Sequence, residues 1–502
     1  MISKLLLFPF LLSIFPILVL YYENIDEIPI MDLILPILLT LLSTIGLFFA
    51  FRYFVKSDIK AGLIITLFSV VFFSYGYFFE IFNNTILYDL DLVHQRYILP
   101  LFIILTISIS FLIIKFKKDL ESLRSIFNVI SIVMILFISI NIISFYIQNE
   151  SENSISNLFF DEKIIIQNNL PDIYHIVFDE YTSSNVLLND LHFDNSSIIN
   201  YLKNSNFSIL ENALSNYPAT EPFLSSTLNL VYLDDKSLEK YDRLDTELKI
   251  NDNFVMKFLK QNGYKIVIPY SGYGTPDRFL ESNQNICSDT VFLKNRFATE
   301  LSRTTIINYF VEKIIEDERR YVQECTFLNL PTISNEFEQP VYVFAHIMMP
   351  HAPYLFDKDG NHVSPKSNKL KGLQGYDDLN GYLNELQFAN KQIKDIVSQI
   401  LKKSNNAIII IQGDTGTSIL NNPDVDDFKK KRLSILFAIH LPENYSIPQN
   451  LSPVNTYRII FNHNFDSNYE LLENRYFWYS EFEENHSDIT HRFIEITNSL
   501  EN

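Results

Sequence analysis

The chain has 502 residues, which is more than one ordinary domain needs, and its apolar residues are concentrated before residue 148. Acidic residues outnumber basic ones by 59 to 40, and the formal net charge is −19 at pH 7. This balance argues against nucleic acid as a partner, because nucleic-acid-binding surfaces are basic.

Five apolar runs occupy the first part of the chain, and each is about as long as the roughly 20 residues that cross a bilayer core. They cover residues 5–22, 33–51, 61–79, 97–114 and 125–147. We therefore predict an α-helical membrane anchor of five helices over residues 1–147. The first run is longer than the apolar part of a signal peptide, and "YYENIDE" follows it in place of a small-residue cleavage site, which favours an uncleaved helix.

The Lys and Arg residues of the connecting loops predict the orientation, since positively charged loops stay in the cytoplasm. The connecting loops fall alternately on the two sides of the membrane. The loops on the side opposite the amino terminus carry only Arg96, beside acidic residues. The amino terminus and the loops on its side carry Lys4, Arg52, Lys56, Lys60, Lys115, Lys117, Lys118 and Arg124. We expect a multi-pass protein of the plasma membrane, with a cytoplasmic amino terminus and everything after the fifth helix outside the cytoplasm.

Residues 148–170 are predicted to be a linker, because they begin with the polar stretch "QNESENSISN". From residue 171 to 502, β-rich apolar runs alternate with helical patterns, which is typical of an α/β domain with a mostly parallel central sheet flanked by helices. Residues 379–403 have apolar side chains at helical spacing and predict an amphipathic helix. The strand candidates are residues 172–178, 264–270, 341–347, 407–412 and 433–441.

The two cysteines, Cys287 and Cys325, both lie in the predicted outer part. Oxidising conditions there permit a disulfide, and two free thiols are the alternative.

Polar residues follow three of the predicted strands, and ligands gather at the carboxyl ends of the strands in such sheets. Asp179 follows the first strand, Asp414 follows the isoleucine run in "IIIIQGDTGTSIL", and His351 lies in "PHAPYLFDKDG" after the third. Two carboxylates and a histidine at neighbouring strand ends suit a divalent cation.

The sequence "DTG" at 414–416 also occurs in aspartic proteases, where two such turns share one proton. This chain contains no second Asp-Thr/Ser-Gly, and a long helical pattern precedes the isoleucine run where a protease would be all-β. The metal-binding interpretation is therefore favoured over the protease.

The stretch "SNYPATEPFLSSTLNL", residues 215–230, places Thr220 where a helix begins. The unpaired N–H groups of a helix amino terminus favour an anion such as a phosphoryl or sulfuryl group. The alternative is that Thr220 is simply the N-cap residue of that helix.

These motifs together resemble the alkaline phosphatase superfamily, in its sulfatase-like branch. "PDIYHIVFDEY" is similar to the first-strand motif whose acidic residue binds metal, here Asp179, and "YPATEPFLSSTLN" to the nucleophile motif, here Thr220. "MPHAPY" resembles the motif whose histidine contacts the transferred group, here His351, and "IIIIQGDTG" the motif that ends a metal-binding strand, here Asp414. Residues 452–465 resemble the closing segment of membrane-bound members.

The layout of five membrane helices and an outer sulfatase-like domain resembles lipoteichoic acid synthases, which transfer phosphoglycerol. The resemblance implies an enzyme that acts on a membrane lipid head group or an envelope glycan, with Thr220 and His351 catalytic. It also implies a divalent cation (Mn, Zn, Ca or Mg) held by Asp179, Thr220, Asp414 and Thr415. Thr415 stands where the transferases have His, a stronger ligand. The competing hypothesis is therefore a non-catalytic envelope module that has lost its metal. The sequence gives no indication of the oligomeric state.

Overall fold

The computed structural model of the chain divides by contacts into two compact units. Unit 1 comprises Met1–Ser156 and Val291–Glu316, and unit 2 comprises Asn157–Thr290 and Asp317–Asn502. The structure describes residues 5–25, 28–83, 95–149, 170–239, 241, 243–273, 279–364, 378–404, 406–420, 427–442, 447–480 and 492–500. The predicted linker, 148–170, lies mostly outside these residues, and the predicted domain boundaries remain an expectation.

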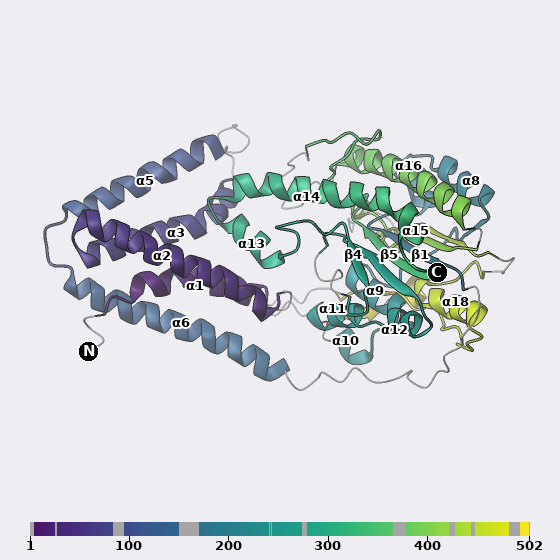
Figure 1. Cartoon of the computed structure of the whole chain (residues 1–502), viewed down its shortest axis with the longest axis horizontal. Coiled ribbons are helices and arrows are strands. Elements are labelled where there is room, and N and C mark those ends of the chain that lie inside the picture. The colour runs from purple at the N-terminus through teal and green to yellow at the C-terminus, as the bar shows by residue number, and fades with distance from the viewer. Residues whose placement is uncertain are drawn as a thin grey trace. The chain divides into compact units, whose positions relative to one another are not determined.

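Unit 1 has a helix at each of the five apolar runs (Figure 1). Four stretches are long and apolar enough to cross a membrane: Ile30–Val55, Asp58–Phe79, Tyr97–Lys115 and Glu121–Ile147. The first helix, with 16 residues, is shorter than the predicted span and covers only about 24 Å at 1.5 Å per residue. The helices are α1 (Phe8–Glu23), α2 (Ile34–Val55), α3 (Asp58–Asn83), α5 (Gln95–Lys115) and α6 (Glu121–Asn149).

Unit 1 also contains α13 (Arg296–Thr304) and the first part of α14 (Asn308–Asn329). The sequence pattern placed residues 291–316 in the outer domain, but by their contacts they group with the N-terminal helices.

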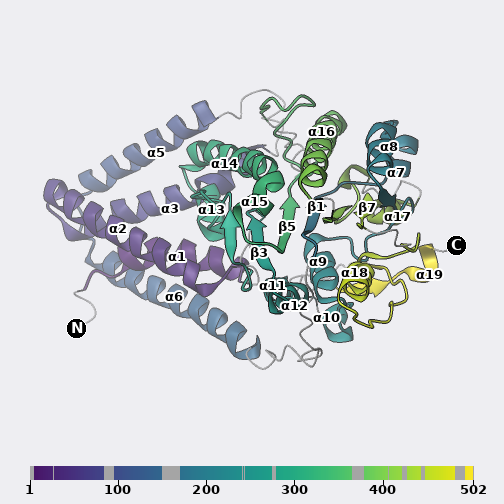
Figure 2. The same ribbon diagram turned by 45° about the vertical axis from the view of Figure 1, so that its right-hand side comes forward.

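Unit 2 is built on a seven-stranded sheet with the strand order β2-β7-β6-β1-β5-β3-β4 (Figure 2). The five strands from β6 to β4 are parallel, and β7 is antiparallel to both of its neighbours. The sheet is therefore mostly parallel, as predicted. The strands are β1 (Ile173–Phe178), β2 (Phe207–Ile209), β3 (Lys265–Pro269), β4 (Gln284–Ile286), β5 (Val341–Ile347), β6 (Ile408–Gly413) and β7 (Phe437–His440).

The strands alternate their side chains between two apolar layers, because successive residues of a strand point to opposite faces. On one face, Tyr174 and Ile176 pack with α16 (Leu379–Lys403) and α8 (Ser196–Asn204). On the other, Ile173 and Val177 pack with α9 (Thr220–Asn229), α12 (Phe254–Gln261) and α18 (Thr456–Asn464). The remaining elements are α7 (Ser184–Asn189), α10 (Asp235–Glu239), α11 (Arg243–Asn251), α15 (Ile333–Glu336), α17 (Phe428–Leu433), α19 (Thr497–Leu500), β8 (Phe477–Tyr479) and β9 (Phe493–Glu495).

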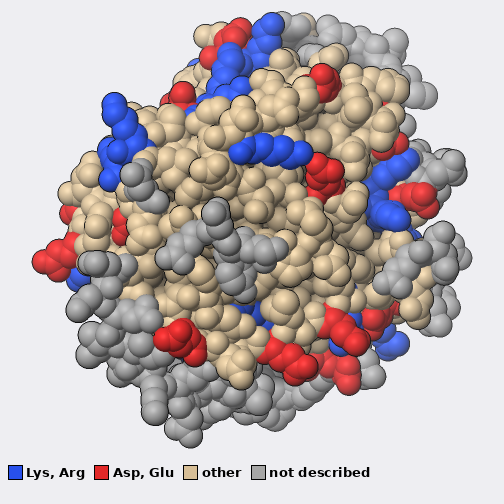
Figure 3. All heavy atoms as spheres, turned by 90° about the vertical axis from the view of Figure 1, so that its right-hand side faces the viewer, with Lys and Arg blue, Asp and Glu red and all other residues tan. Residues whose placement is uncertain are grey.

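Cys287 and Cys325 form a disulfide, with an S–S distance of 2.04 Å, which resolves the two alternatives that the sequence left open. The face of the molecule in Figure 3 carries Lys and Arg as well as Asp and Glu side chains, scattered over a mainly uncharged surface.

Candidate functional site

The site lies at the carboxyl ends of three adjacent parallel strands, β6, β1 and β5. Asp179 follows the last residue of β1, and Asp414 follows the last residue of β6. His346 is the second-last residue of β5 and pairs in register with Val177 of β1. The period of two along each strand puts all three side chains on the face that α9 covers.

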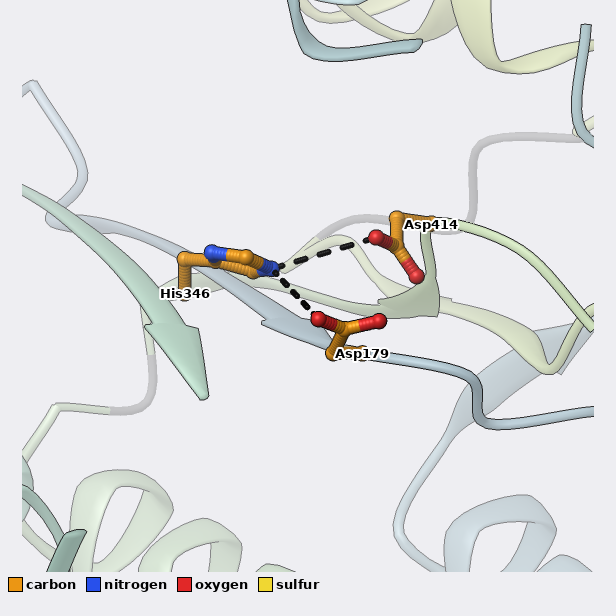
Figure 4. Close-up of side chains that lie close together, drawn as sticks. All are labelled: Asp179, His346 and Asp414. Carbon is orange, nitrogen blue, oxygen red and sulfur yellow. Dashed lines mark ion pairs between the residues drawn. The ribbon is translucent and has the colours of Figure 1, made fainter. Parts of the chain in front are cut away.

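These three residues form a buried group in which each offers one ligand atom, and the ligand atoms all lie within 4.8 Å of one another. The Nε2 atom of His346 lies 4.0 Å from Oδ2 of Asp179 and 3.9 Å from Oδ2 of Asp414 (Figure 4). Figure 4 shows the ring of His346 pointing at both carboxylates from the neighbouring strand. The predicted carboxylates are therefore together, joined by a histidine that the sequence analysis did not select.

Burial and like charge decide the electrostatics of the group. Burial, then the Asp414 and Glu180 carboxylates, raise the pKa of Asp179 well above its ordinary range. Burial lowers the pKa of His346, so the ring favours the neutral form that ligates metals. A bound cation stabilises two buried carboxylates that lie this close to each other.

The group fits a divalent cation. Two ligand atoms that each lie about 2.0–2.2 Å from one ion are at most about 4.4 Å apart, which the two distances from His346 satisfy. Moreover, Oδ2 of Asp179 and both ring nitrogens of His346 are buried and have no hydrogen-bond partner among the described residues. Such orphaned buried atoms need a partner, and an ion supplies one.

Thr220 is the first residue of α9, and its hydroxyl donates a hydrogen bond to Oδ2 of Asp414 at 2.6 Å. The N-cap residue of this helix is Ala219, which makes no side-chain capping bond. The alternative role for Thr220 as N-cap is therefore wrong: the hydroxyl points at a carboxylate of the metal group.

Thr415 is buried and contacts Asp414, a member of this group. Its backbone N–H donates to Oδ1 of Asp414 at 2.6 Å, and its hydroxyl lies 3.4 Å from the same oxygen. Among the described residues, the third member of the group is His346.

His351 lies outside the group, on the segment that follows β5. Its Nε2 atom is 3.9 Å from Oε1 of Glu180, and its side chain is partly exposed. It is therefore at the edge of the site, where it can meet a substrate.

Glu180, which is buried, and Arg432, which is partly buried, form an ion pair next to Asp179. Arg432 donates to Oε1 of Glu180 at 2.9 Å, and it also donates to the carbonyl oxygen of Gly416. Ser418 donates its N–H and its hydroxyl to the other carboxylate oxygen of Glu180. One guanidinium thus offsets part of the negative charge beside the site.

A second set of polar residues surrounds Glu221, the residue that follows Thr220. The Tyr273 hydroxyl donates to Glu221 at 2.9 Å, and Arg243 forms an ion pair with the same carboxylate. The ring of Tyr273 packs edge-on against His346, with the ring centroids 5.3 Å apart. This contact helps to fix the orientation of His346.

Sequence analysis missed His346, Glu180 and Arg432 as site residues. A signal for His346 was present, because it is the only His, Asp, Glu, Lys or Arg in the apolar strand "VYVFAHI". Arg432 is separated from Glu180 by 252 positions, and no local pattern joins them.

Comparison with known proteins identifies the domain. The model of the Sulfatase family matches residues 171–447, which is more than half of the chain. A search of curated proteins finds no significant match.

Several solved structures are similar at low identity. The integral membrane lipooligosaccharide phosphoethanolamine transferase A (EptA) from Neisseria meningitidis is 14% identical, with 91% of this chain and 95% of that chain covered and a TM-score of 0.41. The periplasmic domain of EptC from Escherichia coli, in complex with Zn, is 13% identical, with coverage of 60% and 84% and a TM-score of 0.40.

The lipoteichoic acid synthase LtaP from Listeria monocytogenes is 13% identical, with coverage of 58% and 71% and a TM-score of 0.37. These scores are too low to carry an argument about activity, and the family assignment rests on the match over residues 171–447. The chain therefore belongs to the Sulfatase family.

Proposed function

We propose that the chain is a membrane-anchored, metal-dependent phosphotransferase or phosphohydrolase that acts on lipid-linked or envelope phosphodiesters through Thr220. The observation that carries the proposal is the 2.6 Å hydrogen bond from the Thr220 hydroxyl to Asp414, a member of the buried Asp179–His346–Asp414 group. A hydroxyl at a helix amino terminus, beside a carboxylate that accepts its proton, is suited to nucleophilic attack.

In the first step, Oγ1 of Thr220 forms a bond to phosphorus, and the bond from phosphorus to the donor alcohol breaks. The proton of Thr220 passes toward Oδ2 of Asp414, and the departing alkoxide takes up a proton and leaves as the alcohol. In the second step, a sugar hydroxyl or water forms the new bond to phosphorus and gives up its proton, the Thr220–phosphorus bond breaks, and the Thr220 oxygen takes up a proton to restore the hydroxyl.

The other residues of the site would bind the cation or stabilise the negative charge of the phosphoryl group. Asp179, His346 and Asp414 would hold the divalent cation, which when bound lowers the pKa of a nearby hydroxyl and offsets charge on the phosphoryl oxygens. His351 lies at the edge of the site, where its ring can donate to those oxygens or assist proton transfer. The N–H groups at the start of α9 favour the same negative charge.

Phosphoryl transfer is preferred over sulfate-ester hydrolysis because the formylglycine of sulfatases is made from Cys or Ser, and this chain has Thr220. The apolar helices of unit 1 support a substrate at a membrane, and we propose a lipid head group or an envelope glycan. Orientation with the α/β domain outside the cytoplasm is part of this proposal and rests on the Lys and Arg distribution.

The second candidate function is a non-catalytic envelope module. Thr415 favours it, because its hydroxyl faces Asp414 and it takes the place of a stronger ligand. Against it stand the three buried residues that fit a cation without Thr415.

A substrate screen separates the two candidates. The full chain in detergent is assayed with divalent cations on phosphodiesters, phosphomonoesters and sulfate esters, together with Thr220→Ala and Thr220→Ser. We expect turnover of a phosphodiester by the wild type, none by Thr220→Ala and partial activity in Thr220→Ser. Thr227→Ala is the matched control, because Thr227 is buried two turns along the same helix and its hydroxyl has no hydrogen-bond partner among the described residues. If Thr220→Ala turns the substrate over as fast as the wild type, Thr220 is not the nucleophile.

A further inference from the structure

Residues 291–316 belong by sequence to the stretch between β4 and β5 of the sheet, yet by contacts they are part of unit 1. They comprise α13 and the first part of α14, and Figure 1 shows α13 beside α1 and α3. The chain of the α/β domain thus returns to the membrane helices after α6 has ended.

The contacts of this segment within unit 1 are specific. Phe297 is fully buried in the apolar cluster of α1 and packs edge-on against Tyr21, with the ring centroids 6.1 Å apart. The N–H of Ile306 donates to the carbonyl oxygen of Phe72 in α3 at 3.2 Å. The backbone at Arg303 lies so close to Gly76 that a Cβ atom on Gly76 has no room.

These contacts place the segment toward the carboxyl ends of α1 and α3. Tyr21 lies near the end of α1, and Phe72 lies in the second half of α3. The four spans that contain α2, α3, α5 and α6 run in alternating directions if each crosses the membrane, so α3 and α6 end on the same side. Phe72 is about two helical turns before the end of the span Asp58–Phe79, which is about 10 Å inside it.

Exposed apolar side chains continue from this contact along α14. Ile307, Phe310 and Ile314 are 43%, 63% and 44% exposed, and their spacing of three and four residues places them on one side of the helix. Ile306, directly before them, packs against the apolar cluster of Tyr75 and Phe79, which α3 and α5 share. The exposed apolar side is therefore continuous with the surface of the spanning helices.

We propose that residues 291–316 form a membrane-surface element that inserts Ile307, Phe310 and Ile314 into the lipid leaflet at which α6 ends. Lipid is the contact that we expect for these side chains, because the helices next to them would themselves be surrounded by lipid. Apolar side chains at that depth are removed from water when they insert into the leaflet. Lys313 is exposed about 100° around the helix from Ile314, and we expect its charged end to reach the aqueous phase.

This element is a second connection, in addition to α6, between the chain of the α/β domain and the membrane. Its sequence lies inside the loop that the Cys287–Cys325 disulfide closes, so the chain enters and leaves the bilayer surface from two covalently linked positions. The inference does not depend on the proposed chemistry.

Spin-label accessibility tests the insertion in the full chain, reconstituted in phosphatidylcholine vesicles. Both native cysteines are in the disulfide, so one introduced cysteine gives one label, and a label count of one per chain confirms this. Labels are placed at Phe310→Cys and Ile314→Cys, with Lys313→Cys as the matched control on the same turn. Leu105→Cys, exposed in the span of α5, gives the lipid reference.

We expect the labels at 310 and 314 to collide more with oxygen than with a water-soluble nickel chelate, as at 105, and the ratio to reverse at 313. The same ratio at 310, 314 and 313 overturns the proposal, because the segment then lies in water. Low collision with both reagents at 310 and 314 also overturns it, because a protein partner then covers the surface.

Discussion

Glu385 on α16 is a buried acid, and the structure predicts how its replacement changes the pH dependence of stability. Its side chain is fully buried, and one carboxylate oxygen accepts the N–H groups of Leu355 and Phe356, on the segment that also carries His351. Burial raises the pKa of Glu385 from its ordinary 4.5 to about 8, although these two N–H groups lower it.

The sign follows from proton binding. Between pH 4.5 and 8 the folded state holds a proton on Glu385 that the unfolded state has released, so stability falls as the pH rises through this window. Each unit of pKa shift corresponds to about 1.4 kcal/mol, and the cost of ionising Glu385 therefore reaches about 5 kcal/mol above pH 8. Below pH 4.5 the cost is absent.

Glu385→Gln keeps the acceptor oxygen and removes the titration. We expect the free energy of unfolding of the variant, relative to the wild type, to rise between pH 5 and pH 8 by several kcal/mol, about 5 at most. Thermal unfolding of the full chain in detergent, followed by the fluorescence of Trp478, measures it. Glu338→Gln, at an exposed glutamate, is the control and should show no such change. A constant difference between Glu385→Gln and wild type at both pH values refutes the reasoning.

Three further predictions concern the metal group and the disulfide. His346→Ala should weaken divalent-cation binding in calorimetric titration by at least about 10–100-fold, the loss typical of removing even an outer partner of a metal site, while His351→Ala should leave it unchanged. Thr415→His should tighten binding, because imidazole is a stronger ligand than a hydroxyl; unchanged or lost affinity with the fold intact counts against the placement of the site. Replacing Cys287 and Cys325 together by Ser should lower the free energy of unfolding by about 4 kcal/mol, which is the loop-closure value for a separation of 38 residues. If the midpoint of unfolding by a chemical denaturant equals that of the wild type, this prediction is wrong.

The sheet was largely predictable because its central strands are long apolar runs. The isoleucine run before Gly413 forms β6, and the helical pattern over 379–403 forms α16 with the same bounds. The strands β2 and β4 have three residues each and no apolar pattern of their own. They are strands because they pair with longer neighbours, which the sequence does not reveal. The shorter α1 shows that an apolar run can exceed the helix it contains.

The site was only partly predictable, for a reason that is also physical. Asp179 and Asp414 follow buried strands, and parallel strands bring their carboxyl ends to one edge, so their proximity follows from the sequence. His346 lies inside a strand, and only the alignment of β5 with β1 brings it between the two carboxylates. Thr415, which the resemblance placed in the cation site, donates its backbone N–H to Asp414.

The most direct test of the account is to trap the intermediate on Thr220. The full chain, in detergent with a divalent cation, is mixed with a labelled phosphodiester that it turns over, quenched in acid, digested and sequenced by mass spectrometry. We expect the labelled phosphoryl group on Thr220 of the peptide that contains "NYPATEPF", and none in Thr220→Ala. A wild-type chain that turns the substrate over while the label appears on another residue, or on none at any quench time, contradicts it.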